Sequence, residues 1–279
     1  MVDTARAFVP GHVTGFFTAD QDPDPTKAGS RGAGICLADG VTVSVEHAED
    51  SAVVLDGDPV EMAAVERVLR TLEVPARVEA ETVLPLGSGF GVSGALALGT
   101  ALAVNEAFDR RLSENELVTI AHGAEVEAGT GLGDVVAQAR GGVPIRLEPG
   151  GPQVNVMDGI PTRGRVEYLV LGELATEDVL GGATDALTEA GTRALSEVVR
   201  EPTRDRFMRA ARSFSREAGL LTEEVKAVVD DVAEAGGSAS MAMLGETVFA
   251  FGTGLTDAGY EPRITRVNPG GATVRAPIE

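Results

Sequence analysis

The sequence has little that would support a disulfide, a zinc site or a membrane segment. It contains one cysteine, Cys36, so an internal disulfide is excluded. Its three histidines are scattered without H-E-x-x-H spacing, which argues against a helical zinc site. The longest small-apolar run, 94–104, is too short for a bilayer, because a spanning helix takes about 20 apolar residues. No targeting segment is visible, since Asp3 and Arg6 precede any apolar stretch, and we expect a cytoplasmic protein.

Basic residues are also scarce. The chain has 23 lysines and arginines against 43 acidic residues, a formal net charge of −20, and its lysines are Lys27 and Lys226. Such a surface repels nucleic acid and anionic membranes, so we expect neither as a partner. An acidic, lysine-poor composition is typical of cytosolic proteins of salt-loving archaea, where concentrated salt screens self-repulsion. With 279 residues, 43% of them hydrophobic, the chain can form one large or two smaller globular domains. The composition is also compatible with a homodimer.

A glycine-rich segment lies between a strand pattern and a helix pattern. Residues 77–84 largely alternate between apolar and polar side chains, and residues 95–107 are rich in Ala and Leu on nearly every side. Between them lies Pro85-Leu-Gly-Ser-Gly-Phe-Gly-Val-Ser-Gly94. Backbone without Cβ atoms can approach a polyphosphate closely, and N–H groups at a helix start bind anions. We interpret the segment as a nucleotide phosphate loop; the alternative is a tight turn whose glycines permit close helix packing.

Four known glycine-rich motifs fit this segment less well. A Walker loop needs Lys and then Ser or Thr, whereas Gly94 is followed by Ala95 and Leu96. G-x-G-x-x-G spacing runs from Gly89 to Gly94, but a dinucleotide fold then needs a second strand ending in an acidic residue, and the chain enters a helix at Ser113 instead. Protein kinases share the spacing, yet no His-Arg-Asp or Asp-Phe-Gly triplet follows. The hydrolase elbow G-x-S-x-G fails because Ala95 stands in its last position.

The next segment predicts a capped helix that carries two glutamates. Ser113 and Glu116 form an S-x-x-E capping box, and Gly129 ends the helix about four turns later. On a helical projection Glu125 falls inside the apolar arc, and Glu127 lies just beyond its edge. A carboxylate on a buried face needs a partner or a metal, so Glu125 is a candidate magnesium ligand. The alternative is a surface glutamate on a slightly rotated helix.

Asp134 follows in the run Gly129-Thr-Gly-Leu-Gly-Asp134. By itself it is most simply the N-cap of the helix that follows. An aspartate among glycines that faces a phosphate site can equally accept a proton from a substrate hydroxyl. The local pattern leaves both interpretations open.

The second half of the chain begins after Glu148-Pro-Gly-Gly-Pro152, the best candidate for a linker. Beyond it the patterns predict strands at 165–173, 247–251, 264–267 and 273–275, and helices at 185–199, 204–217 and 222–235. We therefore expect an α+β protein with two domains, 1–150 and 151–279.

Several segments together carry a family resemblance. The loop resembles the second motif of the GHMP kinases, written P-x-x-x-G-L-G-S-S-A-A, although Val92 replaces its first serine. Val9-Pro-Gly-His-Val-Thr-Gly15 looks like the first motif, and Gly131-Leu-Gly-Asp134 looks like the segment with the catalytic aspartate. Together with Gly29-Ser-Arg-Gly-Ala-Gly34, they are similar to the archaeal pantoate kinases, over most of the chain. The third motif, at 236–243, departs from the usual glycine-rich form.

This resemblance implies a two-domain GHMP kinase-like fold. Its N-terminal domain would be ribosomal protein S5 domain 2-like, its C-terminal domain an α/β sandwich, and its active site would lie in the cleft. ATP and Mg2+ are the implied cofactors. The implied ATP-binding residues are Pro85, Gly87, Ser88, Gly89, Gly91, Ser93 and Gly94. Ser93 would also bind magnesium together with Glu125, and Glu127 is the alternative to Glu125. Asp134 would be the general base or the group that orients the substrate hydroxyl.

A pantoate substrate adds a carboxylate, which favours an arginine or backbone donors in a closed pocket. Arg31 is the first candidate, and Lys27 and Arg140 follow; for each, a solvated surface charge is the alternative. His12 would line the same cleft or serve structure alone. We expect an ATP-dependent kinase that makes 4-phosphopantoate for coenzyme A synthesis. The alternatives are a GHMP kinase for homoserine, shikimate or mevalonate, a non-catalytic ATP-binding sensor, and a dinucleotide oxidoreductase.

Overall fold

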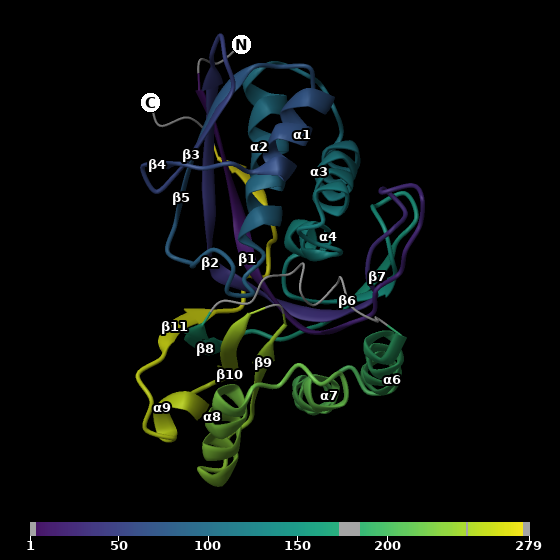
Figure 1. Ribbon diagram of the computed structural model, residues 1–279, viewed down its shortest axis with the longest axis vertical. Coiled ribbons are helices and arrows are strands. Elements are labelled where there is room, and N and C mark those ends of the chain that lie inside the picture. The colour runs from purple at the N-terminus through teal and green to yellow at the C-terminus, as the bar shows by residue number, and fades with distance from the viewer. Residues whose placement is uncertain (1–3, 173–184, 244, 276–279) are drawn as a thin grey trace.

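The computed structural model describes residues 4–172, 185–243 and 245–275, which form two β-sheets with helices packed against them (Figure 1). The larger sheet has eight strands in the order β12-β1-β2-β5-β3-β4, and β6 pairs with both β2 and β7. Its strands are β1 (Thr4–Phe17), β2 (Gly32–His47), β3 (Ala52–Leu55), β4 (Asp58–Pro59), β5 (Ala76–Thr82), β6 (Val143–Glu148), β7 (Val156–Ile160) and β12 (Thr273–Arg275). Every pairing in this sheet is antiparallel except that of β3 with β5.

Helices cover one face of the larger sheet (Figure 1). They are α1 (Ala63–Thr71), α2 (Val92–Ala107), α3 (Glu114–Ala128) and α4 (Asp134–Arg140). In α2 every residue from 94 to 104 is buried, so the prediction of a core helix there is confirmed, although the helix begins at Val92 rather than Ala95. The capping box of α3 is confirmed as well, with Ser113 as its N-cap and Gly129 ending it in the left-handed conformation.

The smaller sheet has the order β11-β8-β10-β9. Its strands are β8 (Arg165–Gly172), β9 (Ala239–Ala242), β10 (Glu246–Phe251) and β11 (Arg263–Arg266), and the second half adds the helices α6 (Asp185–Arg200), α7 (Arg204–Glu217), α8 (Glu223–Glu234) and α9 (Gly254–Asp257). The predicted helices and strands of this half are present within one residue at each described end. The prediction for residue 173 lies outside the described residues.

The two halves meet along the second part of β1. The rings of Phe16 and Phe207 have centroids 6.1 Å apart, and those of Phe17 and Phe214 are 5.7 Å apart, so α7 packs directly on this strand. The predicted boundary at residue 150 stays a prediction. Two strands that follow residue 150 in sequence belong to the larger sheet, because β7 pairs with β6 and β12 pairs with β1.

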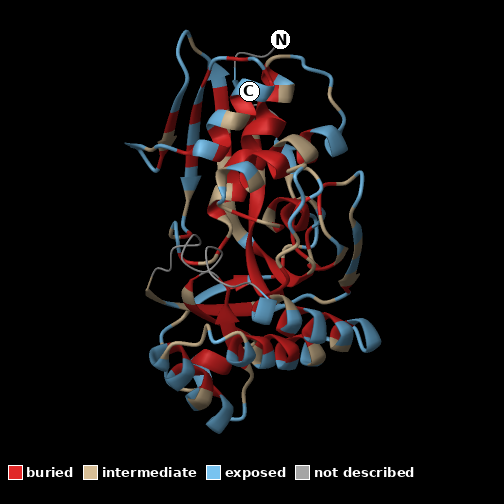
Figure 2. Ribbon diagram, turned by 45° about the vertical axis from the view of Figure 1, so that its right-hand side comes forward, coloured by how far each residue is buried: buried red, intermediate tan, exposed pale blue. Residues whose placement is uncertain are grey.

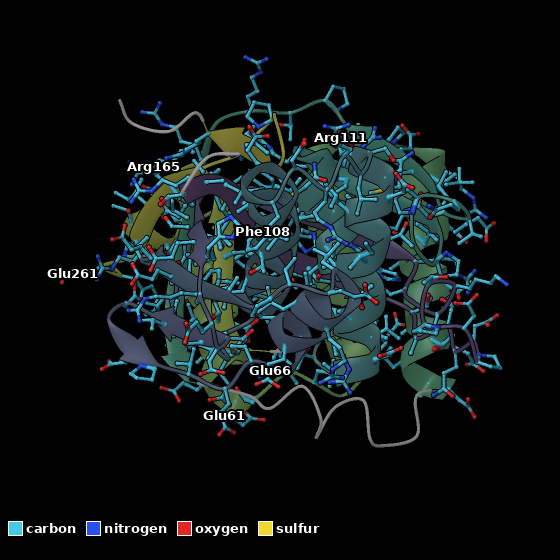
Figure 3. The ribbon with its side chains drawn as sticks, turned by 90° about the horizontal axis from the view of Figure 1, so that it is seen from above. Glu61, Glu66, Phe108, Arg111, Arg165 and Glu261 are labelled. Carbon is cyan, nitrogen blue, oxygen red and sulfur yellow. The ribbon has the colours of Figure 1, made fainter. Side chains whose placement is uncertain are left out.

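Buried residues line the faces where helices meet the sheets, and exposed ones cover the outside (Figure 2). Charged side chains such as Glu61, Glu66 and Glu261 lie at the rim in the view from above (Figure 3). In the part of the chain that the structure describes, no helix combines the length and apolar character that a bilayer crossing requires.

The packing of α2 gives a test of the fold. A Cβ atom at Gly99 would lie 2.5 Å from Cγ2 of Val43, a branched side chain on β2 that cannot swing aside. We expect Gly99→Ala to lower the free energy of unfolding by about 1–3 kcal/mol through overpacking, despite the better helix propensity of alanine. Urea unfolding measures the change.

The matched control is Gly123→Ala in α3, where the nearest contact of a new Cβ would be an ordinary 3.4 Å to Thr26. That variant should be neutral or more stable by up to about 1 kcal/mol. Equal effects of the two substitutions would contradict tight packing between α2 and β2.

Candidate active site

The predicted phosphate loop leads directly into α2. Gly87, Gly89 and Gly91 have φ angles of 76°, 83° and 61°, in the region that favours glycine. Gly91 is the N-cap of α2 and provides no side-chain cap. The first amide groups of a helix have no partner within the helix, so the start of α2 leaves N–H donors for an anion.

The loop borders a cavity of about 250 Å³, called the loop cavity below. Its lining residues are Thr14, Met62, Leu86, Gly87, Gly89, Phe90, Gly91, Val92, Ser93, Glu125, Thr130, Asp134 and Met243. Of the predicted loop residues, Pro85, Ser88 and Gly94 are outside this lining; Ser88 and Gly94 are buried behind it. The structure thus brings Ser93, Glu125 and Asp134 together, although they are far apart in sequence.

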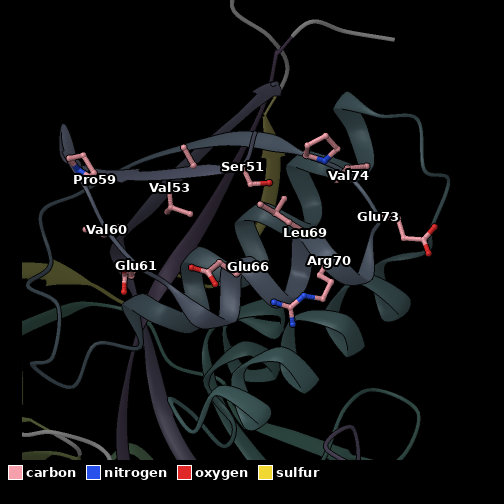
Figure 4. Close-up of a pocket in the computed structure, with 12 residues that line it drawn as sticks. Ser51, Val53, Pro59, Val60, Glu61, Glu66, Leu69, Arg70, Glu73 and Val74 are labelled. Carbon is pink, nitrogen blue, oxygen red and sulfur yellow. The ribbon is translucent and has the colours of Figure 1, made fainter. Parts of the chain in front are cut away.

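A larger cavity of about 750 Å³ lies between β3, β4 and α1 (Figure 4). It shares no lining residue with the loop cavity. Its walls combine apolar side chains such as Val53 and Leu69 with Glu66 and Arg70, and none of the predicted site residues belongs to it.

Glu125 is buried beside the loop, with 3% of its surface exposed. Its Oε1 accepts hydrogen bonds from Ser93 Oγ at 2.5 Å and from Thr130 Oγ1 at 2.8 Å. Burial raises the pKa of Glu125 to about 7. The surface interpretation of Glu125 is therefore wrong. Glu127, the alternative magnesium partner, is half exposed and lies 3.3 Å from Nε of Arg67, away from the loop cavity.

Asp134 is the first residue of α4, and Gly133 is the N-cap, so the N-cap interpretation of Asp134 is wrong. Its Oδ1 lies 2.7 Å from Nδ1 of His12. Burial lowers the pKa of His12, so the neutral ring donates this hydrogen bond. Burial acts to raise the pKa of Asp134, but His12 and the charge of Arg146 outweigh it, so the pKa falls below its ordinary value. Asp134 is thus a carboxylate at neutral pH.

Arg146, a residue that the sequence reasoning missed, is buried on β6 with 2% of its surface exposed. Its Nε donates to the carbonyl of Ser30 at 3.2 Å, and its Nη1 has no partner among the described residues. A Cβ on Gly133 would lie 2.7 Å from that Nε, so the guanidinium adjoins the residue before Asp134. A buried charge with a free donor is costly unless a ligand completes its bonding. The available signal was a lone arginine within the otherwise apolar run Val143-Pro-Ile-Arg-Leu147.

None of the four predicted substrate residues lines the loop cavity, and Arg146 is not part of its lining either. Lys27 is exposed and lies 3.3 Å from Asp24. Arg31 donates to Asp20 at 3.0 Å. Arg140 ends α4 at the surface, where a Cβ on Gly159 would lie 3.4 Å from its Nη2. His12 is fully buried, and its Nδ1 lies 2.7 Å from Asp134 and 3.4 Å from Thr14, two residues that line the cavity.

Comparisons with known proteins identify the family of this chain. Residues 60–142 match the GHMP kinases N terminal domain. The chain is 37% identical to the pantoate kinase of Thermococcus kodakarensis over 88% of this chain and 86% of that protein, and 36% identical to the pantoate kinase of Methanospirillum hungatei over 96% and 95%. A solved phosphotransferase related to the CoA biosynthesis pathway superposes with a TM-score of 0.86, at 32% identity and 98% coverage of both chains. The α+β GHMP kinase fold is thereby confirmed, and the chain belongs to the pantoate kinase family of the GHMP kinases.

Proposed function

We propose that this protein transfers the γ-phosphoryl group of ATP to the hydroxyl group of pantoate, giving 4-phosphopantoate in coenzyme A biosynthesis. The observation that carries the proposal is the position of Asp134 between a phosphate loop and a buried arginine. A Cβ at Gly91 in the loop would lie 3.1 Å from Oδ1 of Asp134, and Arg146 adjoins Gly133 on the other side. A phosphate donor and a hydroxy acid can therefore meet at one carboxylate. The names of the relatives support the same substrate.

The loop and α2 supply what a nucleotide triphosphate needs. The glycines at 87, 89 and 91 let main-chain N–H groups approach phosphate oxygens without side chains in the way. The amides at the start of α2 add a favourable dipole. ATP would lie with its phosphates along this turn.

The residues beside the loop also fit Mg2+. Ser93 and Glu125 offer a hydroxyl and a carboxylate oxygen, the hard ligands that this ion takes. The described residues contain no group of three or more His, Cys, Asp or Glu side chains suited to a metal, which agrees with an ion held by one or two protein groups and the phosphates. When bound, Mg2+ neutralises charge on the phosphate oxygens.

Asp134 would accept the proton of the substrate hydroxyl. The oxygen of that hydroxyl attacks the γ-phosphorus of ATP, and the bond between the γ-phosphorus and the leaving ADP breaks. The hydrogen bond from His12 fixes the carboxylate in one orientation and keeps it ionised. Positioning and charge neutralisation supply most of the rate in such transfers, so little covalent chemistry is required of the protein. Arg146 would bind the substrate carboxylate through the donor that has no partner.

Asp134→Asn tests the assignment of the base. Loss of a general base lowers kcat by about 10²- to 10⁴-fold, while nucleotide affinity should change little because the amide keeps the shape of the carboxylate. ADP release and calorimetric titration with ATP measure the two quantities. If neither the wild-type protein nor Asp134→Asn releases ADP, and both bind ATP equally well, the result would favour an ATP-binding sensor.

A panel of alcohols tests the substrate. ADP release with pantoate, homoserine, shikimate and mevalonate should be fastest with pantoate. Arg146→Lys should raise the KM for pantoate about 10- to 100-fold, because a lysine cannot make the forked, charge-assisted contact, while the KM for ATP stays near the wild-type value. Arg140→Lys at the surface is the control and should leave both constants unchanged. Equal increases in both constants would argue against Arg146 as the carboxylate partner.

Glu125→Gln tests the magnesium site. The amide keeps the shape of the side chain but is a poorer ligand, so the Mg2+ concentration for half-maximal activity should rise about tenfold or more. Glu127→Gln, two residues away on the exposed face of α3, should not change it. The opposite ranking of the two variants would move the magnesium partner to Glu127.

A further inference from the structure

Three carbonyl groups of the phosphate loop accept hydrogen bonds from donors elsewhere in the chain. Thr247 Oγ1 donates to the carbonyl of Ser88 at 2.9 Å, the main-chain N–H of His12 donates to that of Phe90 at 2.9 Å, and Gln138 Nε2 donates to that of Gly91 at 2.8 Å. The donors come from β10, β1 and α4. The loop is therefore fixed from both sheets and from the helix of Asp134.

These bonds determine where the next amide groups point. In a trans peptide the C=O of one residue and the N–H of the next point in opposite directions. The carbonyls at 88, 90 and 91 are turned into the protein, so the N–H groups of Gly89, Gly91 and Val92 point the other way. All three of those residues line the loop cavity. Within the described residues, none of the three amides donates a hydrogen bond to a protein acceptor.

We propose that Thr247 and Gln138 are positioning residues for the nucleotide. The Thr247 side chain holds the Ser88 carbonyl away from the cavity, and the Gln138 side chain holds that of Gly91 together with the main-chain N–H of Ala95 at 3.0 Å. Amide donors are thereby presented to the phosphates, an inference that rests on the proposed kinase function. Both side chains are fully buried, so water cannot take over either hydrogen bond. A carbonyl turned into the cavity would face the phosphate oxygens and repel them. Neither residue belongs to the glycine pattern, and neither lines the loop cavity.

The turn before Thr247 supports the same role. A Cβ at Gly245 would lie 2.2 Å from the carbonyl carbon of Ser88, 2.3 Å from its oxygen and 2.6 Å from the amide nitrogen of Gly89. Main chain at Gly245, the residue before β10, thus lies against main chain of the loop, and a side chain at this position would collide with it. Thr247 extends from the same turn.

The test compares three substitutions of buried threonines. Thr247→Val removes the hydroxyl and keeps the shape, and it should weaken binding of a nonhydrolysable ATP analogue and raise the KM for ATP about five- to tenfold, with the KM for pantoate unchanged. Thr247→Ser should restore both values. Thr100→Val is the matched control, because the hydroxyl of Thr100 in α2 is buried without a partner among the described residues. It should leave nucleotide binding unchanged.

Gln138→Met gives a second, independent test on the other side of the loop. It keeps the length of the side chain and removes the donor, so the same analogue should bind about five- to tenfold more weakly. Because α4 also carries Asp134, kcat should fall in this variant, whereas kcat of Thr247→Val should stay within about twofold of wild type. If either variant fails to fold, the other still tests the proposal.

Calorimetry with the nucleotide analogue does not depend on turnover, so the two proposals fail separately. Wild-type protein that does not phosphorylate pantoate would overturn the proposed function and leave the binding comparison valid. Wild-type nucleotide affinity in both Thr247→Val and Gln138→Met would overturn the positioning role alone. A loss of thermal stability without a change in nucleotide affinity would also overturn it, because that result is what a purely structural contact gives.

Discussion

The missing side chains of a few glycines let the charged groups of this site lie against main chain. A Cβ at Gly131 would come within 2.5 Å of a carboxylate oxygen of Glu125, and one at Gly133 would come within 2.5 Å of the Ser30 hydroxyl. A Cβ at Gly94 would lie 3.2 Å from Oε1 of Gln138. At Gly131 and Gly133 a Cβ would force the facing side chain to shift, so glycine at these positions lets the elements that carry the carboxylates and the guanidinium lie close together. Substitution at any of them would separate groups whose chemistry depends on contact.

The two carboxylates of the loop cavity have different environments, which fits the different roles proposed for them. Burial raises the pKa of Glu125, which accepts hydrogen bonds only from hydroxyl groups. At Asp134, His12 and Arg146 outweigh burial and lower the pKa. Neighbouring carboxylates with pKa values shifted in opposite directions are how a protein separates a base from an acid or a ligand. A cation beside Glu125 would favour its ionised form, and Asp134 is already ionised without one.

Sequence patterns predicted the parts of this site that are local. The glycines of the loop, the capping box at Ser113 and the buried arc that contains Glu125 depend on spacing within one segment, so they could be predicted before the fold was known. The surroundings of Asp134 could not, because they depend on His12, which lies 122 positions away.

Residues that act through contacts between distant segments left weaker traces. The one sequence feature that indicated Arg146 was its charge within an apolar strand. No sequence pattern indicated Thr247 or Gln138. The glycine-rich run around Arg31 favours that residue as the first candidate and Lys27 as a later one, but acidic neighbours pair with both. Arg146 differs from both because its guanidinium is buried and its Nη1 has no partner among the described residues.

The supports of the phosphate loop extend from His12 to Thr247, across almost the whole chain. During synthesis on the ribosome, α2 and its glycine turn emerge long before β10 does. The nascent polypeptide therefore lacks the bond from Thr247 to the Ser88 carbonyl until translation has passed residue 247, and a truncated product that ends earlier would keep only the supports from His12 and Gln138.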